Sequence, residues 1–451
     1  MAEELLSVGL DVGTTSTQLI VSKLSIENKA SSFAVPELEI AERRVLYKSP
    51  IHFTPLLAEG LVDGEGIRRL VEAEYCAAGI DRHQVDTGAV IITGETSRKE
   101  NAAAVLKALS DAAGNFVVAT AGPHLESVLA AKGAGADAFS ADCGKSVLHI
   151  DIGGGTSNLA LIRDGQIVAT GCMNVGGRLL KLDKAGKITY RSPALEGLFS
   201  PKVGEIPTPS QLESLCAMLA QGLEMAAGLR PAEDLLDKLW TTEAGTPWLP
   251  PKDVQALSFS GGVADCIDKQ HESLAFGDIG PLLGAAIRKS KLCAGSYRLG
   301  SETIRATVIG AGCHSTQLSG STVFHRGIEF PLKNLPVVSM EEPTESGIAA
   351  VIALPGLPAA NYRQITTLAQ QLITTHPHGP LLLALEADMA KALGQALALR
   401  TPPSRPILCI DRVKLSPDSY LDVGAPIGSA LPVVVKTLIF NDKLQNFRRS
   451  I

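Results

Sequence analysis

Short apolar runs alternate with helical stretches along this chain, and turn-forming residues separate them. Extended segments are expected where apolar residues run together or alternate, at 8–10, 17–24, 38–47, 89–92 and 116–119. Helices are expected where apolar residues recur with helical spacing, at 63–79, 98–109 and 123–132. Three strands followed by alternating helices and strands indicate a mixed sheet covered by helices.

The same order starts again at residue 147. Strands at 158–163 and 166–172 are joined by Asp164-Gly165, a strong hairpin signal. The other elements of this half are a helix at 211–229, a strand at 256–259 and a helix of small residues at 280–290. Both halves have the element order of a ribonuclease-H-like unit. We therefore expect an α/β protein with two such lobes, at 1–145 and 146–300.

Proline-rich segments interrupt the second lobe, and a third region follows it. The segment 191–210 holds four prolines and few periodic apolar residues, so we interpret it as a loop or lid, and 241–253 is a second connector. The C-terminal region, 301–451, is expected to be α/β as well. Its predicted helices and extended segments are 362–375, 387–400, 381–385 and 406–415.

Two features of the third region are assigned to local structure rather than to chemistry. The segment 306–314 reads as a short strand, 306–309, followed by a glycine-rich turn, 310–314. The turn could be a rival nucleotide or partner contact, but we favour plain turn geometry that helps to dock the C-terminal region. His376 and His378 have no cysteine or carboxylate at ligand spacing, so we expect no metal there.

Two short segments repeat one another at a distance of 140 residues. G-L-D-V-G-T-T-S-T-Q-L at 9–19 returns as H-I-D-I-G-G-G-T-S-N-L at 149–159, with an aspartate offset of 151 − 11 = 140. Each is a strand that ends in Asp, a Gly/Thr turn and a second strand. The offset is far too long for a solenoid and indicates two related lobes. Two such turns facing each other can grip a nucleotide phosphate chain from both sides.

The residue types in these turns suit phosphate and magnesium. Glycines permit φ > 0 and let backbone N–H groups approach phosphate oxygens, and hydroxyls add donors. The predicted phosphate contacts are Gly13, Thr14, Thr15, Gly153, Gly154, Gly155 and Thr156. Asp11 and Asp151 are the predicted catalytic and metal-binding residues, because each carboxylate can hold the waters of a bound Mg²⁺ or orient an attacking water.

A third glycine-containing turn follows the second aspartate. S-F-S-G-G-V-A at 258–264 comes after an expected strand and opens a helix. Gly261 and Gly262 would let a flat ring pack against the backbone, and a helix N-terminus favours nearby phosphate. We expect these two glycines to contact the adenosine.

The order D-V-G-T-T, D-I-G-G-G-T, S-G-G-V-A resembles the ATPase superfamily of actin, heat-shock chaperones and sugar kinases. The resemblance implies that ATP lies between two lobes that open and close. It also implies two hinge helices of small residues, at 122–133 and 278–287. In the first hinge, chaperone relatives place a Glu aimed at the catalytic water, and either His124 or Glu126 could take that place.

Longer strings, at 91–102, 121–136 and 422–440, resemble the ethanolamine ammonia-lyase reactivating factors, and the resemblance runs the whole length. It implies a chaperone-like protein that uses ATP and Mg²⁺. Its partner would be ethanolamine ammonia-lyase, from which it removes damaged cobalamin so that intact adenosylcobalamin can enter. Such a protein is cytoplasmic. The resemblance leaves open both homodimer formation and packaging in a bacterial microcompartment.

Two other functions stay open on the sequence: a small-molecule kinase of the same superfamily and an actin-like scaffold protein. A kinase needs a site for an acceptor hydroxyl, and no distinctive loop for one is found. The triple glycine after Asp151 is closer to the members that hydrolyse with water. D-x-H-x-x-G, which supplies a cobalt ligand in many B12 proteins, does not occur in the sequence, so we expect no tight cobalamin site in this chain.

Composition argues against nucleic-acid and membrane roles. The net charge of −6 and the pI near 5.9 provide no basic stripe for phosphates of DNA or RNA. The longest apolar stretch, 431–440, is interrupted by Lys436 and too short to cross a bilayer. The acidic N-terminus does not read as a secretory signal. Eight scattered cysteines without a C-x-x-C pair suit buried thiols in a reducing cytoplasm.

Overall fold

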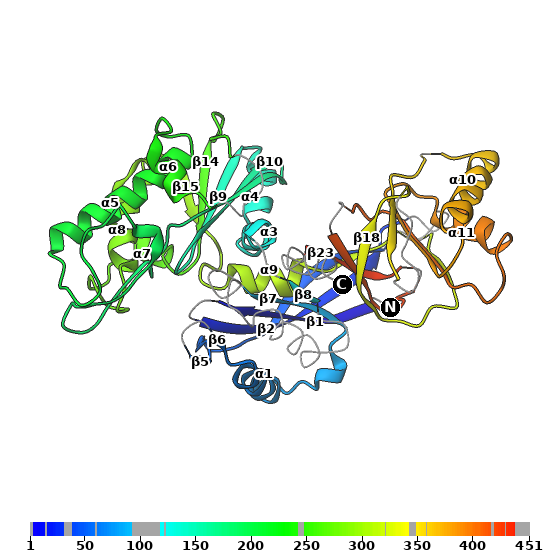
Figure 1. Cartoon of the computed structure of the whole chain (residues 1–451), viewed down its shortest axis with the longest axis horizontal. Coiled ribbons are helices and arrows are strands. Elements are labelled where there is room, and N and C mark those ends of the chain that lie inside the picture. The colour runs from blue at the N-terminus through cyan, green and yellow to red at the C-terminus, as the bar shows by residue number, and fades with distance from the viewer. Residues whose placement is uncertain are drawn as a thin grey trace, which may run out of the picture.

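The computed structural model forms three large sheets, which lie side by side in Figure 1 with the first in the centre, the second on the left and the third on the right. The predicted helix at 98–109 and most of the string 91–102 lie outside the described residues. The described residues are 3–13, 16–30, 38–58, 61–92, 118–120, 123–241, 248–320, 322–341, 349–357, 359–415, 419–428 and 430–437.

The first sheet has the strand order β3-β2-β1-β7-β8. Its central strand β1 (Glu3–Val12) pairs antiparallel with β2 (Ser16–Asn28) and parallel with β7 (Thr87–Ile92). The outer strands are β3 (Leu38–Lys48) and β8 (Val118–Thr120). Along the chain, β3 is followed by three short strands before β7: β4 (His52–Phe53), β5 (Leu56–Ala58) and β6 (Leu61–Val62).

Helix α1 (Gly64–Ala78) covers one face of this sheet, because its buried residues join the core cluster of β1, β2 and β7. The Asp63 side chain accepts a hydrogen bond from the Gly66 N–H and caps the helix start. Gly79, at φ +68°, ends the helix in the left-handed conformation that glycine adopts without strain. The helix predicted at 63–79 is thus confirmed together with its start and stop.

The second sheet repeats this arrangement with the order β11-β10-β9-β14-β15. Its strand β9 (Val147–Ile152) pairs antiparallel with β10 (Ser157–Arg163) and parallel with β14 (Ala256–Ser260). The outer strands are β11 (Gln166–Met173) and β15 (Tyr297–Leu299). The two sheets match in strand order and direction, which confirms the predicted pair of ribonuclease-H-like lobes.

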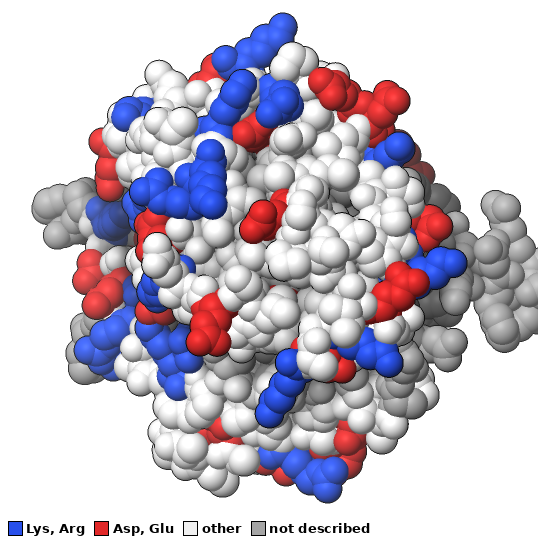
Figure 2. Space-filling view, turned by 90° about the vertical axis from the view of Figure 1, so that its left-hand side faces the viewer, with Lys and Arg blue, Asp and Glu red and all other residues white. Residues whose placement is uncertain are grey.

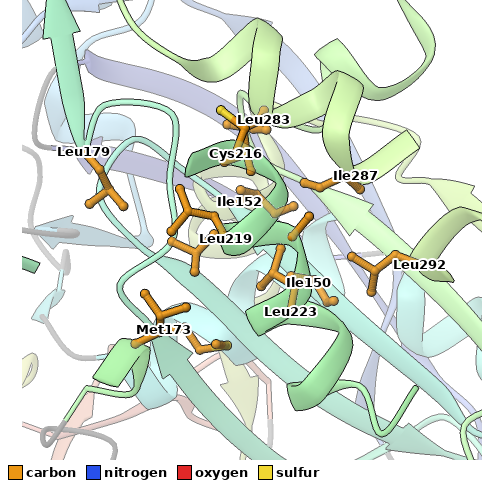
Figure 3. Close-up of a cluster of buried hydrophobic side chains, with 14 of the residues drawn as sticks. Ile150, Ile152, Met173, Leu179, Cys216, Leu219, Leu223, Leu283, Ile287 and Leu292 are labelled. Atoms are coloured by element: carbon orange, nitrogen blue, oxygen red, sulfur yellow. The ribbon is translucent and has the colours of Figure 1, made fainter. Parts of the chain in front are cut away.

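Two helices, α5 (Pro209–Ala226) and α8 (Gly280–Lys289), bury the apolar face of the second sheet. Figure 3 shows side chains of both helices meeting Ile150 and Ile152 of β9. Burial of such side chains contributes about 1.5–3 kcal/mol each. The smaller elements of this lobe are α4 (Ala136–Cys143), β12 (Leu180–Leu182), β13 (Ile188–Arg191), α6 (Asp234–Leu239) and α7 (Asp265–Asp268).

The proline-rich segment 191–210 is mostly irregular, as predicted, and it is anchored on the core. It contains a 3-10 turn at Pro193–Leu195, and α5 begins within it at Pro209. Leu195 and Phe199 are buried, and the Arg191 guanidinium donates to the carbonyl oxygens of both, at 3.0 and 2.7 Å. This segment is therefore a packed insertion.

Helices α3 (Pro123–Gly133) and α9 (Ala306–His314) cross between the two lobes. Helix α3 follows β8 of the first sheet but packs on β9, β10 and β11 of the second. Helix α9 follows β15 of the second sheet but packs on β1, β2 and β7 of the first. A Cβ on Gly310 would lie 2.1 Å from the carbonyl oxygen of Leu129, so the crossing demands glycine there.

Two predictions about this crossing are wrong. The segment 306–314 is a helix, not a strand and a glycine-rich turn. The helix that crosses α3 is α9, not the predicted hinge at 278–287, where α8 packs against α5 and α7 inside the second lobe. Nearly all of α9 is buried, and a short apolar run buried on every side fits a strand or a helix equally well by periodicity.

The third sheet has eight strands in the order β16-β23-β22-β18-β19-β20-β21-β17. Four neighbouring strands are parallel: β18 (Leu332–Val338), β19 (Val351–Leu354), β20 (Leu381–Leu385) and β21 (Ile407–Ile410). Helices α10 (Tyr362–Thr375) and α11 (Ala390–Ala398) pack together with their buried residues in one core cluster. The remaining strands are β16 (Gln317–Leu318), β17 (Phe324–Arg326), β22 (Ser419–Val423) and β23 (Pro432–Thr437).

The division of the chain at residues 145 and 300 stays a prediction. Helix α9 lies beyond residue 300 and packs on the first sheet, so the first lobe draws on two separate parts of the chain.

The outer face of the second lobe, seen in Figure 2, has basic and acidic side chains interspersed with uncharged areas. Its described residues do not build the continuous basic surface that nucleic-acid backbones require. None of the described helices is both long and apolar enough to pass through a bilayer.

Candidate nucleotide-binding site

One cavity of about 350 Å³ is lined by residues of both lobes. The sequence assigned catalytic, phosphate or adenosine roles to nine described residues that line it: Asp11, Gly13, Asp151, Gly153, Gly154, Gly155, Thr156, Gly261 and Gly262. Thr14 and Thr15 lie outside the described residues. The structure thus brings the two repeated turns together, and the group that each residue binds stays a prediction.

The two turns are closed by corresponding backbone hydrogen bonds. The Gly13 N–H donates to the carbonyl oxygen of Ser16, and the Gly153 N–H donates to that of Thr156, each at 2.9 Å. Both bonds are related by the offset of the sequence repeat, since 153 − 13 and 156 − 16 are both 140. Asp11 and Asp151 therefore occupy corresponding places at the ends of β1 and β9.

Asp151 is nearly enclosed, with 6% of its surface exposed. Ser260 of β14 donates a hydrogen bond to its Oδ1. Burial raises the pKa of Asp151 to about 6, although this hydrogen bond acts in the opposite direction. The carboxylate is thus mainly ionised at neutral pH.

Ser260 is itself linked to a buried histidine. His149 Nε2 lies 2.9 Å from Ser260 Oγ, and its Nδ1 lies 3.1 Å from Ser258 Oγ. Burial, together with the charge of Arg298, lowers the pKa of His149 to about 3. The ring is therefore neutral at physiological pH.

Each aspartate also lies opposite an amide side chain in its hairpin. Gln18 is the register partner of Asp11, and Asn158 is that of Asp151. Gln18 Oε1 and Asn158 Oδ1 are buried and accept no hydrogen bond from the described residues. A buried acceptor left without a donor costs about 1–3 kcal/mol. Gln18 lines the cavity, so a bound ligand or its water would satisfy this oxygen.

Arg178 brings a positive charge beside the second turn. Its backbone N–H donates to the carbonyl oxygen of Gly154 at 2.6 Å, and its Nε pairs with Asp278 Oδ2 at 3.1 Å. Burial raises the pKa of Asp278, while the Gly280 N–H and Arg178 lower it. The ion pair fixes the guanidinium at the cavity wall, where it suits phosphate oxygens.

The part of the cavity that the sequence assigned to adenosine is built on Gly261, at φ +87°. A Cβ on this residue would lie 2.3 Å from the carbonyl oxygen of Ile152, so only glycine fits. Val263, Cys266 and Ile304 add apolar wall. Burial raises the pKa of the Cys266 thiol to about 11, so this cysteine serves as an apolar surface rather than a nucleophile.

The structure separates the two residues left open in the first hinge helix. Glu126 lines the cavity from α3. His124 is exposed, and its Nδ1 lies 2.6 Å from Thr170 Oγ1 on β11. Of the two, Glu126 is the residue that lines the cavity.

The donor set suits magnesium with water rather than a closed protein cage. Asp11 and Asp151 line one cavity, yet within the described ranges no three His, Cys, Asp or Glu side chains cluster as metal ligands. Mg²⁺ commonly keeps several waters and takes one or two carboxylates together with substrate phosphates. The carboxylates and the buried Gln18 oxygen fit such an ion.

Sequence reasoning missed Gln18, Arg178 and the chain behind Asp151. Aligning the two repeats would have found the amides, since 158 − 18 is also 140. Arg178 carries no such signal, because it reaches the cavity through the fold of the segment after β11.

Comparison with known proteins assigns the chain to a family. The model of the family described as "Ethanolamine utilisation protein EutA" matches residues 3–351 and 343–441. The chain belongs to this family. It is 38% identical over 465 residues to the ethanolamine ammonia-lyase reactivase EutA of Salmonella typhimurium, covering 97% of this chain and 99% of the relative. The reactivase of the same name from Escherichia coli is also 38% identical, over 470 residues with the same coverage.

Solved structures with a similar fold cover 68% of this chain. EutJ from Carboxydothermus hydrogenoformans is 17% identical, with a TM-score of 0.33 and 88% of its chain covered. A Ppx/GppA family member from Aquifex aeolicus is 12% identical, with a TM-score of 0.42 and 97% covered. The activator of 2-hydroxyisocaproyl-CoA dehydratase from Clostridium difficile, with bound ADPNP, is 11% identical, with a TM-score of 0.33 and 93% covered.

Proposed function

We propose that this protein is an ATP-dependent reactivase of ethanolamine ammonia-lyase, which exchanges damaged cobalamin on the lyase for intact adenosylcobalamin. Membership of the EutA family over nearly the whole chain supports the partner. The observation that carries the ATPase part is that both repeated Asp-Gly turns line one cavity. The proposal places the protein with its lyase in the cytoplasm, or in the microcompartment that packages the lyase.

The cavity residues divide into a phosphate end and a base end. The turns at 13–16 and 153–156 hold the phosphates from the two lobes, and Arg178 neutralises charge beside Gly154. Asp11 and Asp151 would hold Mg²⁺, which would supply charge neutralisation for the triphosphate. Gly261 and Gly262 lie against the adenosine.

Hydrolysis transfers the terminal phosphoryl group to water, so the protein has to place that water. Glu126 on α3 and the amide oxygen of Gln18 on β2 are acceptors that line the cavity. Either can accept a hydrogen bond from the water and direct its oxygen toward the phosphorus. The products are ADP and phosphate.

Movement is coupled to the nucleotide through α3 and α9. Because each of these helices packs on the sheet of the opposite lobe, closure of the lobes around a nucleotide changes their crossing. The two nucleotide states then present different surfaces to the lyase. The free energy that drives each reactivation cycle comes from the difference in affinity for the lyase between these two nucleotide states.

An activity-recovery assay tests the proposal. Ethanolamine ammonia-lyase inactivated with glycerol or cyanocobalamin is incubated with this protein, ATP, Mg²⁺ and adenosylcobalamin, and the return of ammonia production is followed. Recovery is expected with ATP and not without it. Asp11→Asn and Asp151→Asn should each lower phosphate release by about 100-fold.

Asp253→Asn is the matched control, since Asp253 is exposed and pairs with Arg163 away from the cavity. It should recover the lyase as the unmodified protein does. No recovery with any nucleotide would contradict the reactivase proposal. Transfer of labelled phosphate to a sugar, acetate or ethanolamine, instead of release as free phosphate, would favour the kinase.

A further inference from the structure

A row of polar side chains runs up one face of the second sheet to the cavity. Side chains alternate along β9, so Leu148, Ile150 and Ile152 point into the core that Figure 3 shows. The opposite face of the same strand carries Val147, His149 and Asp151. His149 has no exposed surface, although an apolar residue would fill this place without any hydrogen-bonding demand.

The hydrogen-bond distances define a continuous chain from Ser258 to Asp151. In the register of β9 and β14, Ser258 lies beside His149 and Ser260 lies beside Asp151. Ser260 Oγ contacts both Asp151 Oδ1 and His149 Nε2, while Ser258 Oγ contacts His149 Nδ1. Every polar atom of the imidazole therefore has a partner.

Chemistry fixes the direction of this chain. An ionised carboxylate only accepts hydrogen bonds, so the single hydroxyl hydrogen of Ser260 goes to Asp151. The Ser260 oxygen must then accept from His149 Nε2–H. The neutral ring has its bare nitrogen at Nδ1, which accepts from the Ser258 hydroxyl.

The first lobe provides a comparison inside the same molecule. Its positions corresponding to His149 and Asp151 are Gly9 and Asp11, and the register neighbours on β7 are Ala89 and Ile91. None of Gly9, Ala89 and Ile91 has a side-chain donor. Because the two sheets share strand order and register, the fold does not require the polar chain.

We propose that Ser260 and His149 are positioning residues for Asp151, holding its Oδ1 so that Oδ2 is presented to the cavity in one orientation. This inference rests on the proposed ATPase function, in which Asp151 helps to hold Mg²⁺. Asp151 is then fixed by a buried relay of Ser260, His149 and Ser258. A carboxylate held in one rotamer loses no orientational freedom when the ion and its waters bind.

The first measurement reads the chain without nucleotide or metal. Nitrogen-15 NMR of histidine-labelled protein at about pH 8 identifies which ring nitrogen of His149 carries the proton. The His149 signals are assigned by their loss in His149→Gln. We expect the proton on Nε2 in the unmodified protein and a mixture of tautomers in Ser260→Ala, where Nε2–H has lost its acceptor.

The second measurement reads the consequence for the cavity. Ser260→Ala should raise the Mg²⁺ concentration for half-maximal hydrolysis and lower kcat by about tenfold, with the KM for ATP changed less than about twofold. Ser260→Thr restores the hydroxyl and should recover most of the loss. Ser22→Ala is the matched control, because Ser22 is an equally buried serine on β2.

A proton on Nδ1 of His149 in the unmodified protein would overturn the inference. So would a Ser260→Ala variant whose Mg²⁺ dependence and kcat equal those of Ser22→Ala. A purely structural role predicts equal losses of thermal stability in both variants and no change in Mg²⁺ dependence. Failure of the proposed function looks different: the unmodified protein would then bind no Mg²⁺-ATP, whatever the tautomer of His149.

Discussion

Arg178 is the cavity residue whose charge is best placed for the proposed contact with phosphate. Among the described residues that line the cavity, the permanent cations are Arg178 and Lys269. Lys269 is largely exposed and lies 3.7 Å from Asp265, an arrangement that water screens. Arg178 is held by Asp278 beside Gly154, so it is the one of these two cations with a fixed place beside the second turn.

Arg178→Ala should weaken ATP binding by about tenfold. One charge-assisted contact to phosphate is worth about 1.5–3 kcal/mol, and in the variant Mg²⁺ still neutralises part of the phosphate charge. Isothermal titration with Mg²⁺-ATP measures the change. Arg163→Ala is the control, since Arg163 also pairs with an aspartate, Asp253, but outside the cavity. Equal affinity in the two variants would show that Arg178 does not touch the phosphates.

A second residue-scale feature lies in the third region, where Thr322 joins two carboxylates. The Thr322 hydroxyl contacts both Asp388 and Asp411, but it has one hydrogen to donate. Asp411 is fully buried. Burial, and then the neighbouring Asp388, raise the pKa of Asp411 to about 6, against the lowering effects of Thr322 and Arg412. The carboxyl of Asp411 therefore keeps its proton to a higher pH than an exposed aspartic acid does.

This pKa predicts how stability depends on pH. An acid whose folded pKa lies above its unfolded value of 3.8 binds more protons in the folded state, so stability falls as pH rises from about 4 to about 6. Asp388→Asn removes the like charge and should shrink this fall by about 1–2 kcal/mol. Urea unfolding at several pH values measures it, with Asp142→Asn on α4 as an exposed control. An unchanged slope in Asp388→Asn would refute the contribution of Asp388 to the raised pKa of Asp411.

At the scale of elements, the sequence was most informative where a period and its end signals agree. Helix α10 and strand β20 have the predicted bounds, 362–375 and 381–385, because amphipathic spacing and short apolar runs are local properties. The segment 306–314 was misread, since complete burial between α3 and the first sheet removes any amphipathic pattern. Its small residues allow another helix to pack closely against it, and this contact cannot be predicted from a local sequence pattern.

The candidate site divides in the same way. Asp11, Asp151 and the glycines were found because each carries a local turn signal and the turn is repeated. Arg178 and the relay behind Asp151 depend on which strands become neighbours, as in the pairing of β9 with β14 more than 100 residues later. Such contacts follow from tertiary structure alone.

The crossing of α3 and α9 predicts a large effect of a small substitution. Gly310→Ala would place a methyl group 2.1 Å from the carbonyl oxygen of Leu129, so one helix must shift. The free energy of unfolding should fall by about 1–3 kcal/mol, and ATP-dependent closure should be altered. Gly295→Ala is the control, because no atom lies within 4 Å of its Cβ position. Urea unfolding of both variants measures the difference, and similar losses would mean that the crossing tolerates the methyl group.

At the scale of the whole molecule, the two lobes bring more negative than positive charge to the space between them. The described carboxylates that line the cavity are Asp11, Glu126, Asp151, Asp265 and Asp278, against two cations, Arg178 and Lys269. The sum is −5 + 2 = −3 before any ligand binds. A triphosphate is repelled by such a site unless a cation comes with it.

Binding of ATP should therefore depend strongly on Mg²⁺. Removing free Mg²⁺ with EDTA should weaken ATP binding by at least about 100-fold, because the ion offsets both the carboxylates and the triphosphate. Titration calorimetry with and without EDTA measures this, and small-angle scattering of the same samples reports whether the lobes close. Asp265→Asn should lessen the dependence, since it removes one of the repelling charges without touching either turn. Tight ATP binding in EDTA would contradict the arrangement, because it would require the nucleotide phosphates to lie away from Asp11 and Asp151.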